Sequence, residues 1–343
     1  MTGKLHANLS LDLDNKWAYL RAVGRSDWSE RPGYFSVVIP RIVEILGELE
    51  LPLTTFVVGR DLELDENVPL IEKFKSLPDF EFANHSYNHL PWLHTMSEQE
   101  IGEEIDRTSY AIGKRLGNFP VGFRGPGFSC PSEVLRILAN RKFVYDASVF
   151  PTSIAPLARA VFFLRSGLSG EQRAKASKLY GGWTSVLQPN RPYVREVNDS
   201  ALWELPVTVM PFSRTPIHFS YLTFLASFST VAAKAYIYKA MLLCRMTKTQ
   251  PSLLLHPPDF MGSEDDTDMA YFPAMKMKRK AKLEIVRWTL KLFADSFKVM
   301  TMMNHANQLN STTDKPATRH KILPAENAEA VTLNQVYLGS IVR

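Results

Sequence analysis

The chain has 343 residues, of which 45% are hydrophobic and 22% charged, so it is long and apolar enough to bury a large core. Its two cysteines exclude a small disulfide-stapled scaffold and fit a reducing compartment. The net charge of +5 is mildly basic, but no basic stripe interleaved with aromatic residues appears, so we expect no nucleic-acid partner.

Strand and helix patterns alternate from the start of the chain. Residues 5–13, 51–59 and 80–85 predict strands, while residues 35–50 and 68–77 have the spacing of helices. Strands that alternate with helices indicate right-handed βαβ crossovers and a mainly parallel sheet.

The clearest predicted helix begins at Ser97, which forms a capping box with Glu100. Isoleucines from residue 101 onward line one face of this helix, and Gly117 ends it. The remaining predicted elements are strands at 120–125, 143–149, 202–209, 252–256 and 297–302, and a helix at 131–141.

These elements predict an α/β fold, a deformed TIM-like barrel of the (β/α)7 type, as one domain over residues 1–305. A helical segment, centred on 155–180, is inserted at about 151–200, and residues 306–343 form a flexible or peripheral tail. The apolar region 219–244 is interrupted by two lysines, so it predicts a buried or interfacial helix rather than a membrane span. The first residues carry no apolar export signal, and we expect a cytoplasmic protein.

The first polar motif is "SLDLD", at the end of the first predicted strand. Asp12 and Asp14 are two residues apart, so both carboxylates point to the same side of a strand. Two such charges destabilise each other unless a cation lies between them or one carries a proton. In a barrel, this end of the strand lies on the face where active sites form. A loop-capping aspartate with a solvated neighbour would explain the pair equally well.

The second motif is "NHSYNH", which follows a predicted strand. The spacing of His85 and His89 allows both imidazoles to bind one metal ion. An isolated pair with this spacing is more often two surface histidines. Here the pair is expected on the same face as Asp14, and two histidines with one carboxylate leave positions for water and substrate, as a catalytic metal requires.

Two more motifs end strands. In "FRGPGFS", Arg124 can pair with a carboxylate, and Gly125 and Gly127 allow the backbone to approach a ligand; a plain Gly-Pro turn is the other interpretation. In "LLLHPPDF", His256 ends a buried strand, where a histidine can act as a general acid or be purely structural. Four such motifs at four strand ends predict one common site.

This ordered set resembles the polysaccharide deacetylase superfamily, the NodB-homology domain of carbohydrate esterase family 4, over roughly residues 5–305. Gly127 stands where the family often has a tyrosine, and Phe128 follows it. The resemblance implies a catalytic base at Asp12 held by Arg124, an acid at His256, metal ligands at Asp14, His85 and His89, and substrate or oxyanion contacts at Gly127, Phe128, Asp146 and Trp17.

The resemblance also implies an activity: hydrolysis of an N-acetyl or N-formyl group on an amino sugar, in a glycan or a lipid-linked glycan precursor. A divalent metal, Zn²⁺ with Co²⁺, Mn²⁺ or Fe²⁺ as alternatives, would activate water, Asp12 would take its proton, and His256 would protonate the amine. Two other functions stay open: hydrolysis of a non-sugar amide, as in allantoinase-like members of the superfamily, and glycan binding without catalysis. A glycosidase is excluded, because Asp12 and Asp14 project side by side instead of flanking a bond.

The predicted partner surface is a membrane. The apolar region 217–244 and the segment 155–180 favour contact with a lipid surface or a lipid-linked substrate, at the inner face of the membrane. The basic run "KMKRKAK" at 276–282 indicates either the wet face of a helix or a contact to anionic headgroups.

Overall fold

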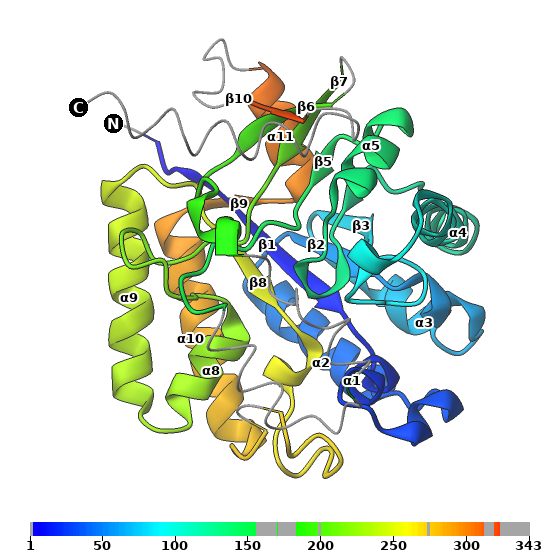
Figure 1. Ribbon diagram of the computed structural model, residues 1–343. Coiled ribbons are helices and arrows are strands. Elements are labelled where there is room, and N and C mark those ends of the chain that lie inside the picture. Colours follow the sequence, from blue (N-terminus) through cyan, green and yellow to red (C-terminus); the bar gives the residue numbers. More distant parts are fainter. Residues whose placement is uncertain are drawn as a thin grey trace.

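The computed structural model describes residues 3–155, 170, 183–197, 200–272, 275–311 and 319–322. Seven parallel strands form its central sheet, which curls into a half-barrel with helices on the outside (Figure 1). They are β1 (His6–Leu13), β2 (Leu53–Val57), β3 (Phe80–Asn84), β4 (Gly122–Phe123), β5 (Tyr145–Asp146), β7 (Ser200–Glu204) and β8 (Ser252–Leu255). Their spatial order is β7-β5-β4-β3-β2-β1-β8. The predicted α/β class and the deformed (β/α)7 barrel are confirmed.

The chain that follows β7 narrows the opening of the half-barrel. The Val207 N–H donates to the carbonyl of Val149, and the Thr208 N–H donates to the carbonyl of Ser252 in β8 at 3.1 Å. Three further strands extend this sheet: β9 (Lys298–Met300) pairs with the start of β1, β6 (Tyr193–Val197) runs antiparallel to β7, and β10 (Arg319–Ile322) pairs with β6.

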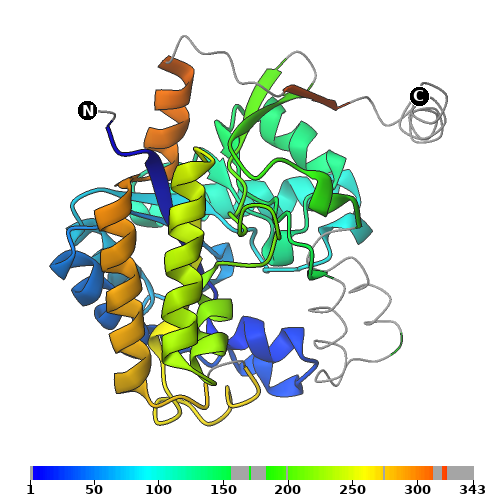
Figure 2. The same ribbon diagram turned by 90° about the vertical axis from the view of Figure 1, so that its left-hand side faces the viewer.

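Helices cover the outside of the sheet, and Figure 2 shows two of the longest side by side. The helices are α1 (Lys16–Ala22), α2 (Phe35–Glu48), α3 (Val68–Ile71), α4 (Glu98–Leu116), α5 (Ser132–Asn140), α8 (Phe219–Ala226), α9 (Thr230–Met246), α10 (Arg279–Ser296) and α11 (Met302–Ser311). The capping box of Ser97 and Glu100 is present at the start of α4, and Gly117 ends that helix at φ 97°, as predicted.

Strand β1 shows how the sequence divides the two faces of the sheet. Leu9, Leu11 and Leu13 belong to the large core cluster, which also contains the buried side of α2. Because side chains alternate along a strand, Ser10 and Asp12 point to the opposite, inner face of the half-barrel. Both are buried there, which places polar groups inside the half-barrel.

Several predicted elements differ from the structure. The apolar region 219–244 forms two helices, α8 and α9, and no helix in the described residues is long and apolar enough to cross a bilayer. Almost all of the predicted helical segment 155–180 lies outside the described residues. Helix α11 continues to Ser311 with Ala306 fully buried, so the tail predicted as flexible or peripheral from residue 306 begins inside a packed helix. The strand β10, also in that tail, was not predicted.

Candidate active site

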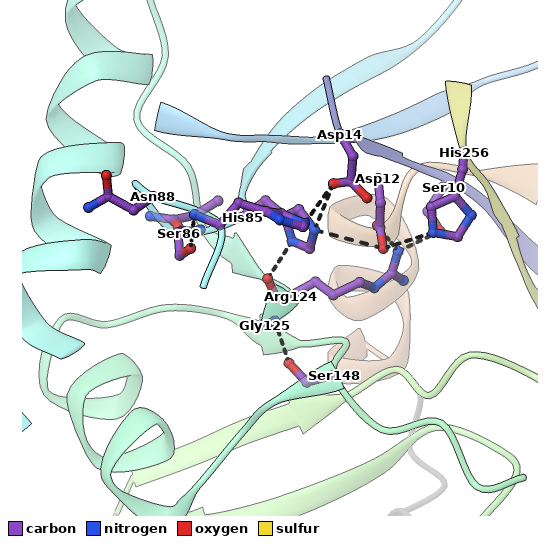
Figure 3. Close-up of polar contacts among 12 residues, drawn as sticks. Ser10, Asp12, Asp14, His85, Ser86, Asn88, Arg124, Gly125, Ser148 and His256 are labelled. Carbon is purple, nitrogen blue, oxygen red and sulfur yellow. Dashed lines mark hydrogen bonds and ion pairs between the residues drawn. The ribbon is translucent and has the colours of Figure 1, made fainter. Parts of the chain in front are cut away.

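The polar motifs follow β1, β3, β4 and β8, and they lie near one another because these strands fall within the run β4-β3-β2-β1-β8 of the sheet. The carboxyl ends of parallel strands share one edge of a sheet, where active sites of barrels form. Figure 3 shows Asp12, Asp14, His85, Arg124 and His256 converging from four strands on one small region. The structure thus brings these side chains together, along with His89 from the loop after β3.

Asp14 lies against two imidazoles. Its Oδ1 is 2.9 Å from His89 Nε2 and 3.4 Å from His85 Nε2. All three side chains are nearly buried, and their ligand atoms lie within 4.8 Å of one another. The same Asp14 Oδ1 has no hydrogen-bond partner although it is buried. A buried carboxylate oxygen without a partner is costly, and a cation between the three groups would satisfy it.

The protonation of His85 can be deduced from its other nitrogen. His85 Nδ1 lies 2.6 Å from the carbonyl oxygen of Arg124. Since a carbonyl only accepts, Nδ1 carries a proton and donates it, so Nε2 is the nitrogen that faces Asp14. Burial by itself would lower the pKa of His85, but Asp12 and Asp14 outweigh it and raise that pKa above its ordinary value. This carbonyl-held orientation is typical of metal-binding histidines.

The charges of the cluster favour metal binding. Burial by itself would raise the pKa of Asp14, but His89 and His85 outweigh it and hold that pKa well below its ordinary value. Burial lowers the pKa of His89, so this imidazole is neutral at neutral pH. An ionised carboxylate beside a neutral imidazole is the ligand state that a divalent cation needs.

Asp12 is held by Arg124 in a buried ion pair. Arg124 Nη1 lies 2.6 Å from Asp12 Oδ1, and the guanidinium is completely buried. Arg124 also donates to the Ala147 carbonyl at 2.9 Å and to Ser10 Oγ at 3.1 Å, and stacks 4.1 Å from the centre of the Phe56 ring. These contacts fix the guanidinium, which in turn fixes the carboxylate.

The second oxygen of Asp12 faces the space between two histidines. Asp12 Oδ2 is 3.9 Å from His85 Nε2 and 3.8 Å from His256 Nε2, too far for a direct hydrogen bond in either case. His256 is oriented from behind by Ser220, whose Oγ lies 3.1 Å from His256 Nδ1. Its backbone N–H donates to Asp259 at 2.8 Å. The free nitrogen of His256 therefore points into the site.

The loop after β4 supplies backbone groups. Gly127 and Phe128 both have positive φ, 58° and 64°, and the Phe128 N–H donates to the Gly125 carbonyl at 2.9 Å. The loop is tied down through Gly125, whose N–H donates to Ser148 Oγ at 2.8 Å. The Ser148 hydroxyl in turn donates to Asp146.

Asp146 therefore anchors this loop. Its first carboxylate oxygen accepts from Ser148 and its second from the Cys130 thiol at 3.3 Å. Trp17, the other predicted substrate contact, is only 1% exposed. Its indole N–H donates to Asp61 at 2.8 Å, and its ring packs with Val58. Both side chains therefore support the site from inside the structure: Asp146 bonds Ser148 and Cys130, and Trp17 bonds Asp61. Their contact with substrate stays a prediction.

One supporting residue escaped the sequence reasoning. Glu104, buried on α4, accepts from the backbone N–H groups of Tyr87 and Asn88 at 2.9 and 2.7 Å, and from the Asn88 side chain. These bonds hold the loop that carries His85 and His89. The sequence does contain a sign of this role, because Glu104 lies three residues after Ile101, on the apolar face of the helix. A charged side chain is buried at such a position only when it has hydrogen-bond partners.

Comparison with known proteins agrees with this geometry. Residues 31–145 match the family model described as polysaccharide deacetylase. Over this segment the chain is similar to polysaccharide deacetylases. The matched segment contains His85, His89 and Arg124, whereas the motifs on β1 and β8 lie outside it. No curated protein matches the chain.

One solved structure supports the same fold. A presumed polysaccharide deacetylase from Mycobacterium smegmatis is 20% identical, with 93% of this chain and 96% of that one covered and a TM-score of 0.57. More distant are a family 4 carbohydrate esterase from Streptomyces lividans in complex with acetate (12% identity, 92% and 98% covered, TM-score 0.43) and a family 4 pseudoenzyme from Bacillus anthracis (14% identity, 94% and 71% covered, TM-score 0.44).

Proposed function

We propose that the chain is a metal-dependent hydrolase that removes an N-acetyl or N-formyl group from an amino sugar in a glycan or a lipid-linked glycan precursor. The match of residues 31–145 to polysaccharide deacetylases supports a hydrolase acting on an acetylated carbohydrate. The observation that carries the metal-dependent mechanism is the unpartnered, buried Oδ1 of Asp14 between two imidazoles, beside the ion pair of Asp12 and Arg124.

Asp14, His85 and His89 fit a divalent cation. One carboxylate and two imidazoles suit Zn²⁺, and Co²⁺, Mn²⁺ and Fe²⁺ accept the same donors. A cation bound there would activate a water molecule and polarise the acyl carbonyl. Three protein ligands leave room in the coordination shell for water and substrate, as hydrolytic metal sites do.

Asp12 is the proposed general base. Arg124 occupies its Oδ1, so Oδ2 is the oxygen that would accept the proton of the attacking water. The guanidinium pairs with the carboxylate and keeps it from rotating, as a positioned base requires. His256 is the proposed acid: its Nε2 faces the same space and would protonate the departing amine, with Ser220 holding Nδ1.

A backbone N–H would stabilise the oxyanion that forms at the acyl carbon. Of the two donors that the sequence suggested, the Phe128 N–H already donates to Gly125, so Gly127 is the better candidate. The products are acetate or formate and a free amino sugar. We retain the predicted cytoplasmic location, at the inner surface of the membrane, as part of this proposal.

The test is to measure bound metal and released acetate, formate and ammonia over a panel of N-acylated sugars and small amides. We expect stoichiometric metal and release of acetate or formate from a sugar. Asp14→Ala and His85→Ala should lose both metal and turnover, whereas His6→Ala, at the opposite end of β1, should keep both. Turnover that survives in the Asp14 and His85 variants would refute the site. Release of ammonia from a non-sugar amide alone would refute the substrate class.

A further inference from the structure

The outward side of α9 is apolar and exposed. Its buried side packs into the core through Ala233, Ile237 and Cys244. Five of the ten exposed large hydrophobic side chains in the described residues lie on the opposite side or at the turn before it: Phe228 (77%), Val231 (77%), Tyr238 (57%), Leu242 (45%) and Met246 (70%). Four of these share one side of the helix, since their spacings of seven and four residues are helical repeats. We call these five residues the α9 face.

The sequence around the α9 face is basic and lacks acids. Between Glu204 and Asp259 there is no aspartate or glutamate, but there are five lysines and arginines: Arg214, Lys234, Lys239, Arg245 and Lys248. Lys239 and Arg245 are exposed on α9 itself. Helix α10 packs beside α9 (Figure 2), and the exposed Lys276, Lys278 and Lys280 lie at or just before its start.

Aromatic rings connect the α9 face to the active site. His218 lies 6.3 Å from His256 between ring centres, and Tyr221 lies 6.4 Å from His218. Along α8, Phe224 follows at 6.4 Å from Tyr221, and the exposed Phe228 at 5.1 Å from Phe224. The proposed acid and the edge of the exposed face are thus joined by a continuous row of rings.

We infer that the α9 face docks on the surface of a bilayer that contains anionic lipids. Apolar side chains in a stripe enter the boundary between headgroups and acyl chains, and lysines and arginines beside them pair with anionic headgroups. A second copy of the chain fits less well, because a symmetric contact would oppose two basic surfaces without an acid between them. The acid-free stretch thus favours an anionic partner over self-association.

Docking on a bilayer adds to the proposed function. It rests on that function in one respect only, the chemical nature of the substrate. The end of α8 would lie at the lipid surface, and the row of rings would lead from there to His256. A lipid-linked amino sugar could then reach the site while its lipid stays in the bilayer.

The experiment measures sedimentation of the full chain with vesicles of phosphatidylcholine, with or without about a third of phosphatidylglycerol, at low and high salt. We expect binding to the anionic vesicles, with weakening at high salt because the charges are screened. Lys239→Gln with Arg245→Gln removes two charges and should weaken binding about 25-fold, at about fivefold per charge. Tyr238→Glu with Leu242→Glu should weaken it at least about tenfold.

Helix α4 provides matched controls, since Tyr110 is 65% exposed there and Lys114 is exposed. Tyr110→Glu and Lys114→Gln should bind vesicles like the unmodified chain. Three results would overturn the inference. The chain could fail to bind anionic vesicles, the α4 and α9 changes could have equal effects, or the chain could form a dimer that Tyr238→Glu dissociates. Hydrolysis of a soluble N-acetyl sugar without vesicles should be unchanged in the α9 variants, so failed docking and failed chemistry give different results.

Discussion

Glu104 offers the sharpest test of how the site is held. Its carboxylate accepts three N–H groups from Tyr87 and Asn88, in the middle of the loop between His85 and His89. That loop is otherwise unfavourable, because Ser86 and His89 have positive φ of 59° and 52°. Replacing Glu104 by alanine removes the acceptor and leaves the loop free to relax into other conformations.

The size of the effect follows from the bonds that are lost. A hydrogen bond to a charged group contributes about 1.5–3 kcal/mol, and a buried donor left without a partner costs about 1–3 kcal/mol. Two backbone N–H groups lose their acceptor at once, so we expect Glu104→Ala to lower the free energy of unfolding by about 2–5 kcal/mol. Because the histidines would no longer be oriented, metal affinity should fall about 10–100-fold.

Urea unfolding gives the first quantity, and competition with a chromophoric zinc chelator gives the second. Glu103→Ala is the matched control, since Glu103 is the adjacent exposed residue of α4 and bonds only within that helix, to Gln99. Glu104→Gln should fall between the two, because it keeps one acceptor oxygen without the charge. If Glu104→Ala folded but bound Zn²⁺ as tightly as Glu103→Ala does, the loop would not depend on Glu104 and the reasoning would be wrong.

Three further predictions concern other contacts, the last with a control variant. Asp12→Asn should keep stoichiometric metal while kcat falls by about 10²–10⁴, since the base is removed and the ligands remain; parallel loss of metal would make Asp12 a ligand instead. Burial raises the pKa of Asp61 from 3.8 to about 7, so the unfolded chain ionises this carboxyl near pH 4 but the folded chain only near pH 7, and stability falls as pH rises between them. Urea unfolding at pH 4 and at pH 7 measures this loss of stability, which is up to about 4 kcal/mol. Asp61→Asn should abolish the loss. If the variant lost as much stability between the two pH values as the unmodified chain does, the assignment would be wrong. Gly125→Ala would place a Cβ 1.9 Å from the Ser129 carbonyl oxygen and should destabilise the chain by about 1–3 kcal/mol. Gly47→Ala in α2 meets no atom within 4 Å and should stabilise it by up to about 1 kcal/mol; equal shifts in the urea midpoint would refute the steric argument.

The order of the elements and the grouping of the site residues could be read from local pattern. Alternating apolar and polar residues marked β1, the helical spacing marked α2 and α4, and a capping box marked the first residue of α4. Parallel strands end at a common edge, so polar motifs at strand ends predicted that Asp14, His85 and His256 would lie near one another. Such inferences need only neighbouring residues and the rules of parallel sheets.

The sequence by itself therefore determined the α/β barrel and the set of polar side chains at its carboxyl edge. Only the tertiary structure decided which of those groups lack partners and which are already satisfied: Asp14 Oδ1 is unpartnered, whereas Asp146 holds a loop and the Trp17 indole bonds Asp61. The role of Glu104 in holding the histidine loop was likewise visible only in the tertiary structure. Burial and hydrogen-bond partners arise from residues far apart in the chain, so periodicity cannot show them. For the same reason, only packing reveals that α9, apolar on both sides, leaves one side exposed.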